Sequence, residues 1–92
     1  MPNPPDHTID LSDSNATEYD TSAGTTIAWH NSTTSDITLN PPTCVSPSGS
    51  TDIPAGQTSR NFTVNAGNGL FTYSFTVGAE LGTRNGSIRV NN

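Results

Sequence analysis

The stretch that decides the fold is Phe71-Thr72-Tyr73-Ser74-Phe75-Thr76-Val77. Large apolar or aromatic residues alternate there with small hydroxyl-bearing residues. This is the pattern of a strand with one buried and one solvated face. It predicts a strand over Phe71–Val77 whose large side chains all point into the core of the domain.

The same alternation recurs along the rest of the chain, and no window has the apolar spacing of a helix. It predicts five further strands, at His7–Ser12, Thr25–His30, Asp36–Asn40, Ser59–Asn65 and Ser87–Asn91. Short strands separated by turn residues are typical of an all-β, Greek-key antiparallel β-sandwich, here of about 6–8 short strands. Trp29 is expected at the centre of the core.

The segments between these strands carry turn signals. Asn65–Gly69 contains an Asn-Gly pair between two predicted strands, which favours a hairpin. Ile53–Gln57 predicts a turn with Pro54 in its second position and Gly56 in its fourth. Val45–Ser50 is expected to be a flexible loop inside the domain.

The size and composition fit one small domain. The chain has 92 residues, of which 29% are hydrophobic. Since one domain usually has ~100–200 residues, the chain is long enough for one domain only. We expect a loose N-terminal leader over residues 1–6 and a single β-sandwich over residues 7–92. Nearly all of the large apolar residues are needed for its core.

The charge argues against two classes of partner. The chain has three arginines, no lysine and a net charge of −5, so it lacks the basic surface on which nucleic-acid binding and binding to anionic membranes depend. No apolar run approaches the ~20 residues that span a bilayer, so no membrane insertion is expected. We expect a monomer whose partner is a protein or a glycan.

The location is open between two alternatives. The first residues have neither a basic region nor an apolar segment of a signal peptide. Either the protein stays inside the cell, or the sequence is a mature domain that begins with an initiator methionine. The surface, rich in Thr, Ser and Asn and free of Lys, favours the second alternative, with an extracellular, periplasmic or cell-envelope location.

The residues with catalytic or metal-binding chemistry do not form a recognisable motif. Cys44 is the only cysteine, so an internal disulfide and a usual Cys/His zinc site are excluded. Cys44 is interpreted as a small residue in a Pro-rich loop, because no cation near it in sequence would activate a thiol. The acidic residues of the first 20 positions do not have the spacing of an EF-hand and are expected to form a solvated face: Asp6, Asp10, Asp13, Glu18 and Asp20.

Other constellations are equally weak. There is no G-x-S-x-G motif, and the expectation is a protein without enzyme activity. Four Asn-x-Ser/Thr sequons occur, close to the number that chance gives in so Asn-, Ser- and Thr-rich a chain: Asn15, Asn31, Asn61 and Asn85. An aromatic platform for glycans is not expected, since only Tyr19 is predicted to be exposed. The other aromatic residues have the inward phase of core side chains: Trp29, Phe62, Phe71, Tyr73 and Phe75.

Several segments resemble the cupredoxin family. Thr26–Asn31 is similar to its "V-x-W-x-N" strand, Gly69–Phe75 to "G-x-Y-x-Y-x-C", and Gly86–Val90 to the closing "G-x-I-x-V" strand. Ile53–Thr58 also fits the family pattern. The resemblance spans roughly residues 7–91 and implies a cupredoxin-like sandwich; an immunoglobulin-like sandwich, which shares much of this pattern, is the alternative.

The resemblance also implies where copper ligands would lie. The first His would fall near Ser35 or Asp36, the Cys on Phe75, the second His within Gly78–Glu80, and the Met near Thr83 or Arg84. None of these positions has the family residue, and copper–thiolate sites need the Cys and both imidazoles. The resemblance therefore implies a copper-free cupredoxin, to which we assign no catalytic, cofactor-binding or metal-binding residues.

Three functional hypotheses follow. The first is a non-enzymatic binding or structural module of an exported or cell-envelope protein. The second is a metal (copper)-binding carrier with a site outside the family pattern, made from His7 and His30 with Asp36 or Cys44. Against it, the phase of the strand predicts that His30 points outward, opposite to Trp29. The third is an immunoglobulin-like adhesin repeat.

Overall fold

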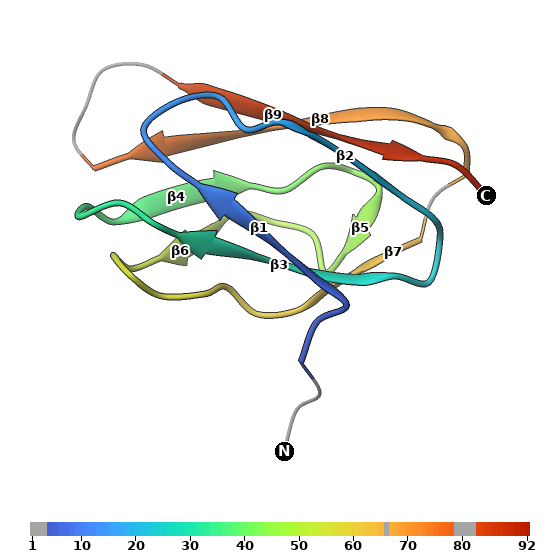
Figure 1. Ribbon diagram of the computed structural model, residues 1–92, viewed down its shortest axis with the longest axis horizontal. Coiled ribbons are helices and arrows are strands. Elements are labelled where there is room, and N and C mark those ends of the chain that lie inside the picture. Colours follow the sequence, from blue (N-terminus) through green and yellow to red (C-terminus); the bar gives the residue numbers. More distant parts are fainter. Residues whose placement is uncertain (1–3, 66, 79–82) are drawn as a thin grey trace.

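The computed structural model describes residues 4–65, 67–78 and 83–92, and these residues form nine strands and no helix. The strands are β1 (His7–Leu11), β2 (Glu18–Thr21), β3 (Thr26–Asn31), β4 (Ile37–Asn40), β5 (Val45–Ser46), β6 (Thr51–Ile53), β7 (Phe62–Val64), β8 (Gly69–Val77) and β9 (Arg84–Val90). A four-stranded sheet has the order β1-β3-β7-β5, and a five-stranded sheet has the order β2-β9-β8-β4-β6. The two sheets form a β-sandwich, which confirms the predicted fold class, and Figure 1 shows the course of their strands.

The two sheets are mixed rather than wholly antiparallel. Strand β1 pairs with β3 in parallel, with Ile9 opposite Trp29, and β2 pairs in parallel with β9. The chain leaves the first sheet after β1, forms β2 in the other sheet and then returns as β3, so β1 and β3 can run in the same direction. Alternation alone does not reveal the relative direction of two edge strands.

All six predicted strand regions contain a strand. The predicted strand at Ser59–Asn65 is shorter than expected, because the side chain of Ser59 interrupts the ladder: its hydroxyl accepts a hydrogen bond from the N–H of Trp29 at 3.0 Å. Three strands were not predicted: β2 has only half-buried or exposed residues, and β5 and β6 have two and three residues. Strands this short or this polar depend on their partners in the sheet.

Two of the predicted connections were wrong and a third is shifted. Asn65–Gly69 does not close a hairpin, because it leads from β7 in one sheet to β8 in the other. The predicted loop Val45–Ser50 begins with β5, where Val45 pairs with Val64. The predicted turn starts one residue later, since the N–H of Gln57 donates to the carbonyl of Pro54 at 3.0 Å. Gly56 is then its third residue, with φ +74°, a conformation that favours glycine.

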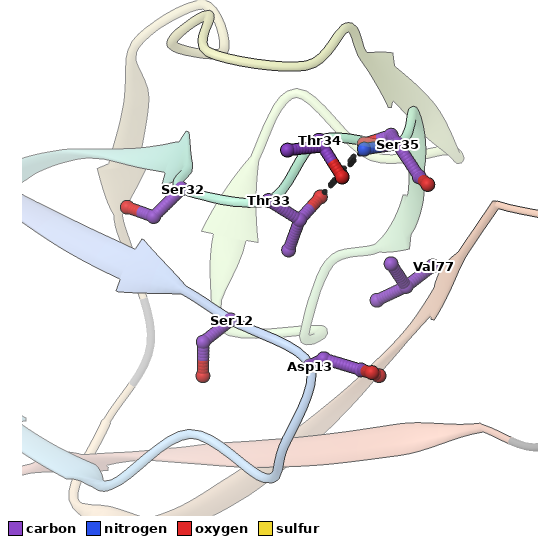
Figure 2. Close-up of a pocket in the computed structure, with 7 residues that line it drawn as sticks. All are labelled: Ser12, Asp13, Ser32, Thr33, Thr34, Ser35 and Val77. Carbon is purple, nitrogen blue, oxygen red and sulfur yellow. Dashed lines mark hydrogen bonds between the residues drawn. The ribbon is translucent and has the colours of Figure 1, made fainter.

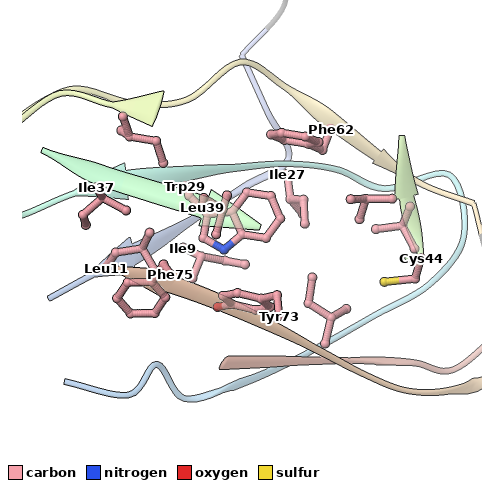
Figure 3. Close-up of a cluster of buried hydrophobic side chains, with 14 of the residues drawn as sticks. Ile9, Leu11, Ile27, Trp29, Ile37, Leu39, Cys44, Phe62, Tyr73 and Phe75 are labelled. Atoms are coloured by element: carbon pink, nitrogen blue, oxygen red, sulfur yellow. The ribbon is translucent and has the colours of Figure 1, made fainter. Parts of the chain in front are cut away.

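The core is centred on Trp29, as predicted. Its ring meets Phe62 edge-on at 5.1 Å and Tyr73 at 5.3 Å, measured between centroids, and Figure 3 shows these rings between the two sheets. The aromatic residues of β8 and Val77 face inward, although Phe71 near the start of the strand is only half-buried and its neighbour Leu70 is exposed. Tyr73 lies directly over its strand partner Gly86, so that a Cβ there would be 2.3 Å from the tyrosine oxygen.

The edge near the N-terminus corrects one prediction. Tyr19 is half-buried rather than exposed, because its ring packs against the core and stacks on His7 at 4.1 Å between centroids. Of the expected leader, residues 1–3 lie outside the described residues. Asp6 is bonded to Thr26 of β3 through both its N–H and its carboxylate.

Candidate functional site

The positions that the cupredoxin resemblance marks come together at one end of the sandwich. The N–H of Gly78 donates to the carbonyl of Asp36 at 2.7 Å, and a Cβ at Gly78 would be 3.1 Å from that of Ser35. Phe75 is the strand partner of Arg84. Positions 79 and 80, including Glu80, lie outside the described residues. The sequence therefore identified residues from three segments that are neighbours in space.

The groups at these positions have structural partners. Phe75 is fully buried in the core, and Gly78 has no side chain. A carboxylate oxygen of Asp36 accepts the N–H of Ala55 at 3.2 Å. Arg84 donates to the carboxylate of Asp13 at 2.8 Å. Thr83 is exposed, and Ser35 offers a hydroxyl, which is not one of the soft sulfur or imidazole ligands of a copper–thiolate site.

The two histidines face in different directions. His30 lies in register with Asp10 on the outer face of the first sheet, and its Nδ1 is 2.9 Å from the hydroxyl of Thr58. His7 has the opposite, inward phase at the exposed end of β1, where it stacks on Tyr19. Asp10, the strand partner of His30, lies three residues after His7. His7 and His30 are therefore about 10 Å apart along the strand direction. The strand geometry thus keeps the proposed carrier ligands His7 and His30 apart.

Cys44 is not available to such a site either. It is fully buried, and Figure 3 places it at the end of the core remote from Phe75 and Ile37. Burial raises the pKa of the Cys44 thiol, and a backbone hydrogen bond at Cys44 offsets part of this effect. Within the described ranges, no three His, Cys, Asp or Glu side chains come close enough to hold a metal ion.

The acidic residues of the first 20 positions are all exposed, as predicted, but they do not share one face, because Asp10 belongs to β1 of one sheet and Glu18 and Asp20 to β2 of the other. Asp13 pairs with Arg84, and Glu18 pairs with Arg89 at 3.2 Å between Oε2 and Nε. Both pairs connect the N-terminal segment to β9. They are partly solvated, so each contributes only about 0–1 kcal/mol to stability.

Asn31 is a residue whose role the sequence did not reveal. It is fully buried at the end of β3. Its amide nitrogen donates to the carbonyls of Ser35 and Ile53 at 2.7 and 2.9 Å, and its oxygen accepts from the N–H and the hydroxyl of Thr33 at 2.8 and 2.6 Å. Asn31 thus fixes the loop after β3 and ties it to β6. In the sequence, its burial was signalled only by its inward phase, which it shares with Ile27 and Trp29. Because Asn31 is buried, its sequon is not accessible to glycosylation in the folded protein.

A pocket of about 320 Å³ lies beside this loop. We call it the end pocket; it is lined by Ser12, Asp13, Ser32, Thr33, Thr34, Ser35 and Val77. Figure 2 shows it between the bend after β1 and the loop after β3, with Val77 of β8 at its side. Apart from Val77, every lining residue has a hydroxyl or a carboxylate.

Two polar groups in the core lack a hydrogen bond to any described residue. The indole N–H of Trp29 and the hydroxyl of Tyr73 are buried without a hydrogen-bond partner among the described residues. Burial raises the pKa of Tyr73, and the nearby indole N–H lowers it by a smaller amount.

The comparisons with known proteins support a similarity of fold only. No protein-family model and no curated protein sequence matches the chain. A solved structure of a mutant of amicyanin with Cu(I) is similar to it, with a TM-score of 0.62 and 16% sequence identity over 91% of this chain and 80% of the amicyanin chain. Amicyanin is a cupredoxin, so the sandwich is cupredoxin-like, as the sequence resemblance implied. At this identity the likeness concerns the fold alone.

The described residues hold no helix long and apolar enough to cross a membrane.

Proposed function

We propose that this chain is a non-enzymatic, copper-free cupredoxin-like domain that acts as a binding or structural module of an exported or cell-envelope protein. The observation that carries the proposal is Phe75. The cupredoxin pattern has its thiolate ligand at this position, and here a fully buried phenyl ring packs there among the core side chains. A ring offers no ligand atom and occupies space that a metal site would need.

The neighbouring positions support the same proposal. Ser35, Asp36 and Gly78 supply hydroxyl, carboxylate and backbone groups, whereas a copper–thiolate site needs sulfur and imidazole. The carboxylate of Asp36 is already bonded to a backbone N–H.

The end of the sandwich is held together by protein groups. Asn31 fixes the loop after β3, and the ion pair of Asp13 and Arg84 connects the bend after β1 to β9. In this proposal these contacts order the loop after β3 and the bend after β1, as metal ligands can order loops in other proteins.

Titration with Cu(II), followed by absorption spectroscopy, tests the copper-free assignment. We expect no intense visible charge-transfer band, because Cys44 is buried and remote from the expected ligand positions. A strong thiolate-to-copper band that disappears in Cys44→Ser would overturn the proposal.

Calorimetry tests the alternative carrier. Saturable binding of one copper ion that is lost in both His7→Ala and His30→Ala would favour a copper carrier. Asn15→Ala is a suitable control, because Asn15 is exposed and lies on the connection between β1 and β2. We expect no saturable binding that depends on the histidines.

The proposed location rests on the composition of the chain, which has 15 Thr, 11 Ser, 10 Asn and no Lys in 92 residues. Fractionation of the native host with an antibody against this domain tests it. Recovery in the cytoplasm alone would contradict an exported or envelope location.

A further inference from the structure

The end pocket has features of a ligand site that the proposed function does not specify. Ligand pockets usually measure ~300–1,000 Å³, and at about 320 Å³ the end pocket is at the small end of that range. This is room for one small ring.

One wall of the pocket is fixed in place. The hydroxyl of Thr33 donates to the Asn31 side chain at 2.6 Å and also contacts the carbonyl of Ser35 at 2.8 Å. The N–H of Ser35 donates back to the Thr33 hydroxyl at 3.2 Å. Because Asn31 is fully buried, the loop after β3 is anchored to the core, and a ligand would not have to order it on binding.

The described lining of the pocket carries one charged side chain, which is ion-paired. Among the described lining residues Asp13 is the single carboxylate, and Arg84 binds it through Nη2–Oδ1 at 2.8 Å while Nε contacts the Asp13 carbonyl at 3.4 Å. The other carboxylate oxygen, Oδ2, accepts no hydrogen bond from the described residues. The carboxylate of Asp13 is thus an acceptor already paired with a guanidinium, and the other described lining residues carry no charge, which favours an uncharged ligand.

The remaining lining is amphipathic. Val77 supplies an apolar surface, and Figure 2 shows the methyl group of Thr33 directed into the space between the two loops. Around these lie hydroxyls, which as a group can both donate and accept hydrogen bonds: Ser12, whose oxygen is 3.0 Å from that of Ser14, and Ser32, Thr34 and Ser35. A pyranose ring has the matching chemistry, with C–H groups for the apolar surface and hydroxyls for the rim.

We propose that the end pocket binds one neutral sugar unit of a glycan. Sugar hydroxyls would replace the hydrogen bonds of displaced waters, with the carboxylate of Asp13 as the main acceptor. The inference rests on the proposed function as a binding module and gives it a site and a ligand class. It does not use the aromatic side chains, which are occupied in the core.

NMR titration of the ¹⁵N-labelled chain tests the proposal. The probes are the methyl glycosides of glucose, galactose, mannose and N-acetylglucosamine, with glucuronate as the charged comparison. We expect at least one neutral glycoside to give saturable shifts centred on the amides of residues 12–13, 32–35 and 77. Since a small ligand gains little free energy per atom, the expected Kd is on the order of 1 mM.

Variants connect binding to the pocket. Asp13→Asn should weaken binding roughly tenfold, because a hydrogen bond to a charged acceptor is lost. Asp52→Asn is the matched control: Asp52 is also exposed and accepts one hydrogen bond, from Thr38, on the outer face of the other sheet. If Asp13→Asn fails to fold, the double variant Ser12→Ala and Ser32→Ala replaces it. Both residues are exposed, so this variant should fold, and both line the pocket, so it should bind the glycoside more weakly.

Several results would overturn the inference: no saturable shifts with any neutral glycoside, shifts centred elsewhere, tighter binding of glucuronate, or binding unchanged in the pocket variants. None of these depends on copper. A thiolate–copper band would instead refute the proposed function, so the two failures are distinguishable.

Discussion

The contact between Tyr73 and Gly86 gives the sharpest prediction about stability. The two residues are partners in the ladder of β8 and β9, and the tyrosine ring lies across the glycine. A Cβ added by Gly86→Ala would be 2.3 Å from both Cζ and the hydroxyl oxygen of Tyr73, and 2.8 Å from Cε2. The backbone of Gly86 is not in the left-handed region, so the expected effect is steric.

The expected magnitude follows from the surroundings of the ring. Tyr73 cannot simply move away, because Trp29 lies against it at 5.3 Å and Phe75 at 6.5 Å between centroids. Overpacking of a filled core costs ~1–3 kcal/mol, whereas replacing glycine by alanine gains about 0.4–1 kcal/mol through the unfolded chain. We expect a net loss of about 1–2 kcal/mol, which corresponds to a fall in Tm of roughly 4–16 °C for a domain of this size.

A double-mutant cycle separates the clash from other effects. Tyr73→Leu removes the ring atoms that the new Cβ would meet, so Gly86→Ala should be nearly neutral in that background. The expected coupling between the two sites is about 2 kcal/mol. Gly67→Ala is the control, because Gly67 has no atom within 4 Å of a Cβ and is not in the left-handed region; it should change stability by less than about 0.5 kcal/mol.

Urea unfolding followed by Trp29 fluorescence measures all of these variants. Equal destabilisation by Gly86→Ala with and without the Tyr73 ring would refute the steric reasoning, and so would a neutral effect in the wild-type background.

Three further predictions concern single buried groups. Asn31→Ala should lower the free energy of unfolding by about 2–4 kcal/mol in urea, because it removes four hydrogen bonds in the interior; a loss no larger than that of the exposed control Asn15→Ala would contradict this. Burial raises the pKa of Tyr73 above its value in the unfolded chain, so its contribution to stability is complete below about pH 10 and is lost as the pH rises through the folded pKa. Tyr73→Phe should flatten this alkaline decline in stability, and an unchanged pH profile would argue against it. Cys44, whose pKa burial also raises, should react with a thiol reagent only after unfolding in urea, and rapid labelling of the folded protein at pH 8 would refute its burial.

The sequence predicted the core well because alternation reports directly on burial. Trp29, Phe62, Tyr73 and Phe75 all have the predicted inward orientation. Their phase is set by the two-residue repeat of a strand, which does not depend on the rest of the fold. The resemblance likewise identified positions that are neighbours in space, since it carried information about the order of the strands.

What the sequence missed depends on partners that are distant along the chain. Strand β2 is polar and forms because β9 offers it a parallel partner, and Asn65–Gly69 has hairpin chemistry although its flanking strands enter different sheets. Tyr19 was expected to be exposed because its neighbours are acidic, but the stack with His7 joins two strands of different sheets. A local pattern does not contain these pairings.

Asn31 shows how the fold and the candidate site are connected. A buried amide is costly unless its hydrogen bonds are satisfied, and Asn31 makes four, all to the loop after β3 or to β6. The same loop forms one wall of the end pocket and carries Ser35, a position that the cupredoxin pattern associates with its first histidine ligand. The loop can therefore stay ordered without a metal, because its anchor is in the core. Because the order of this loop does not depend on metal ligands, we propose that this end of a cupredoxin-like sandwich can do without copper and present a different binding surface.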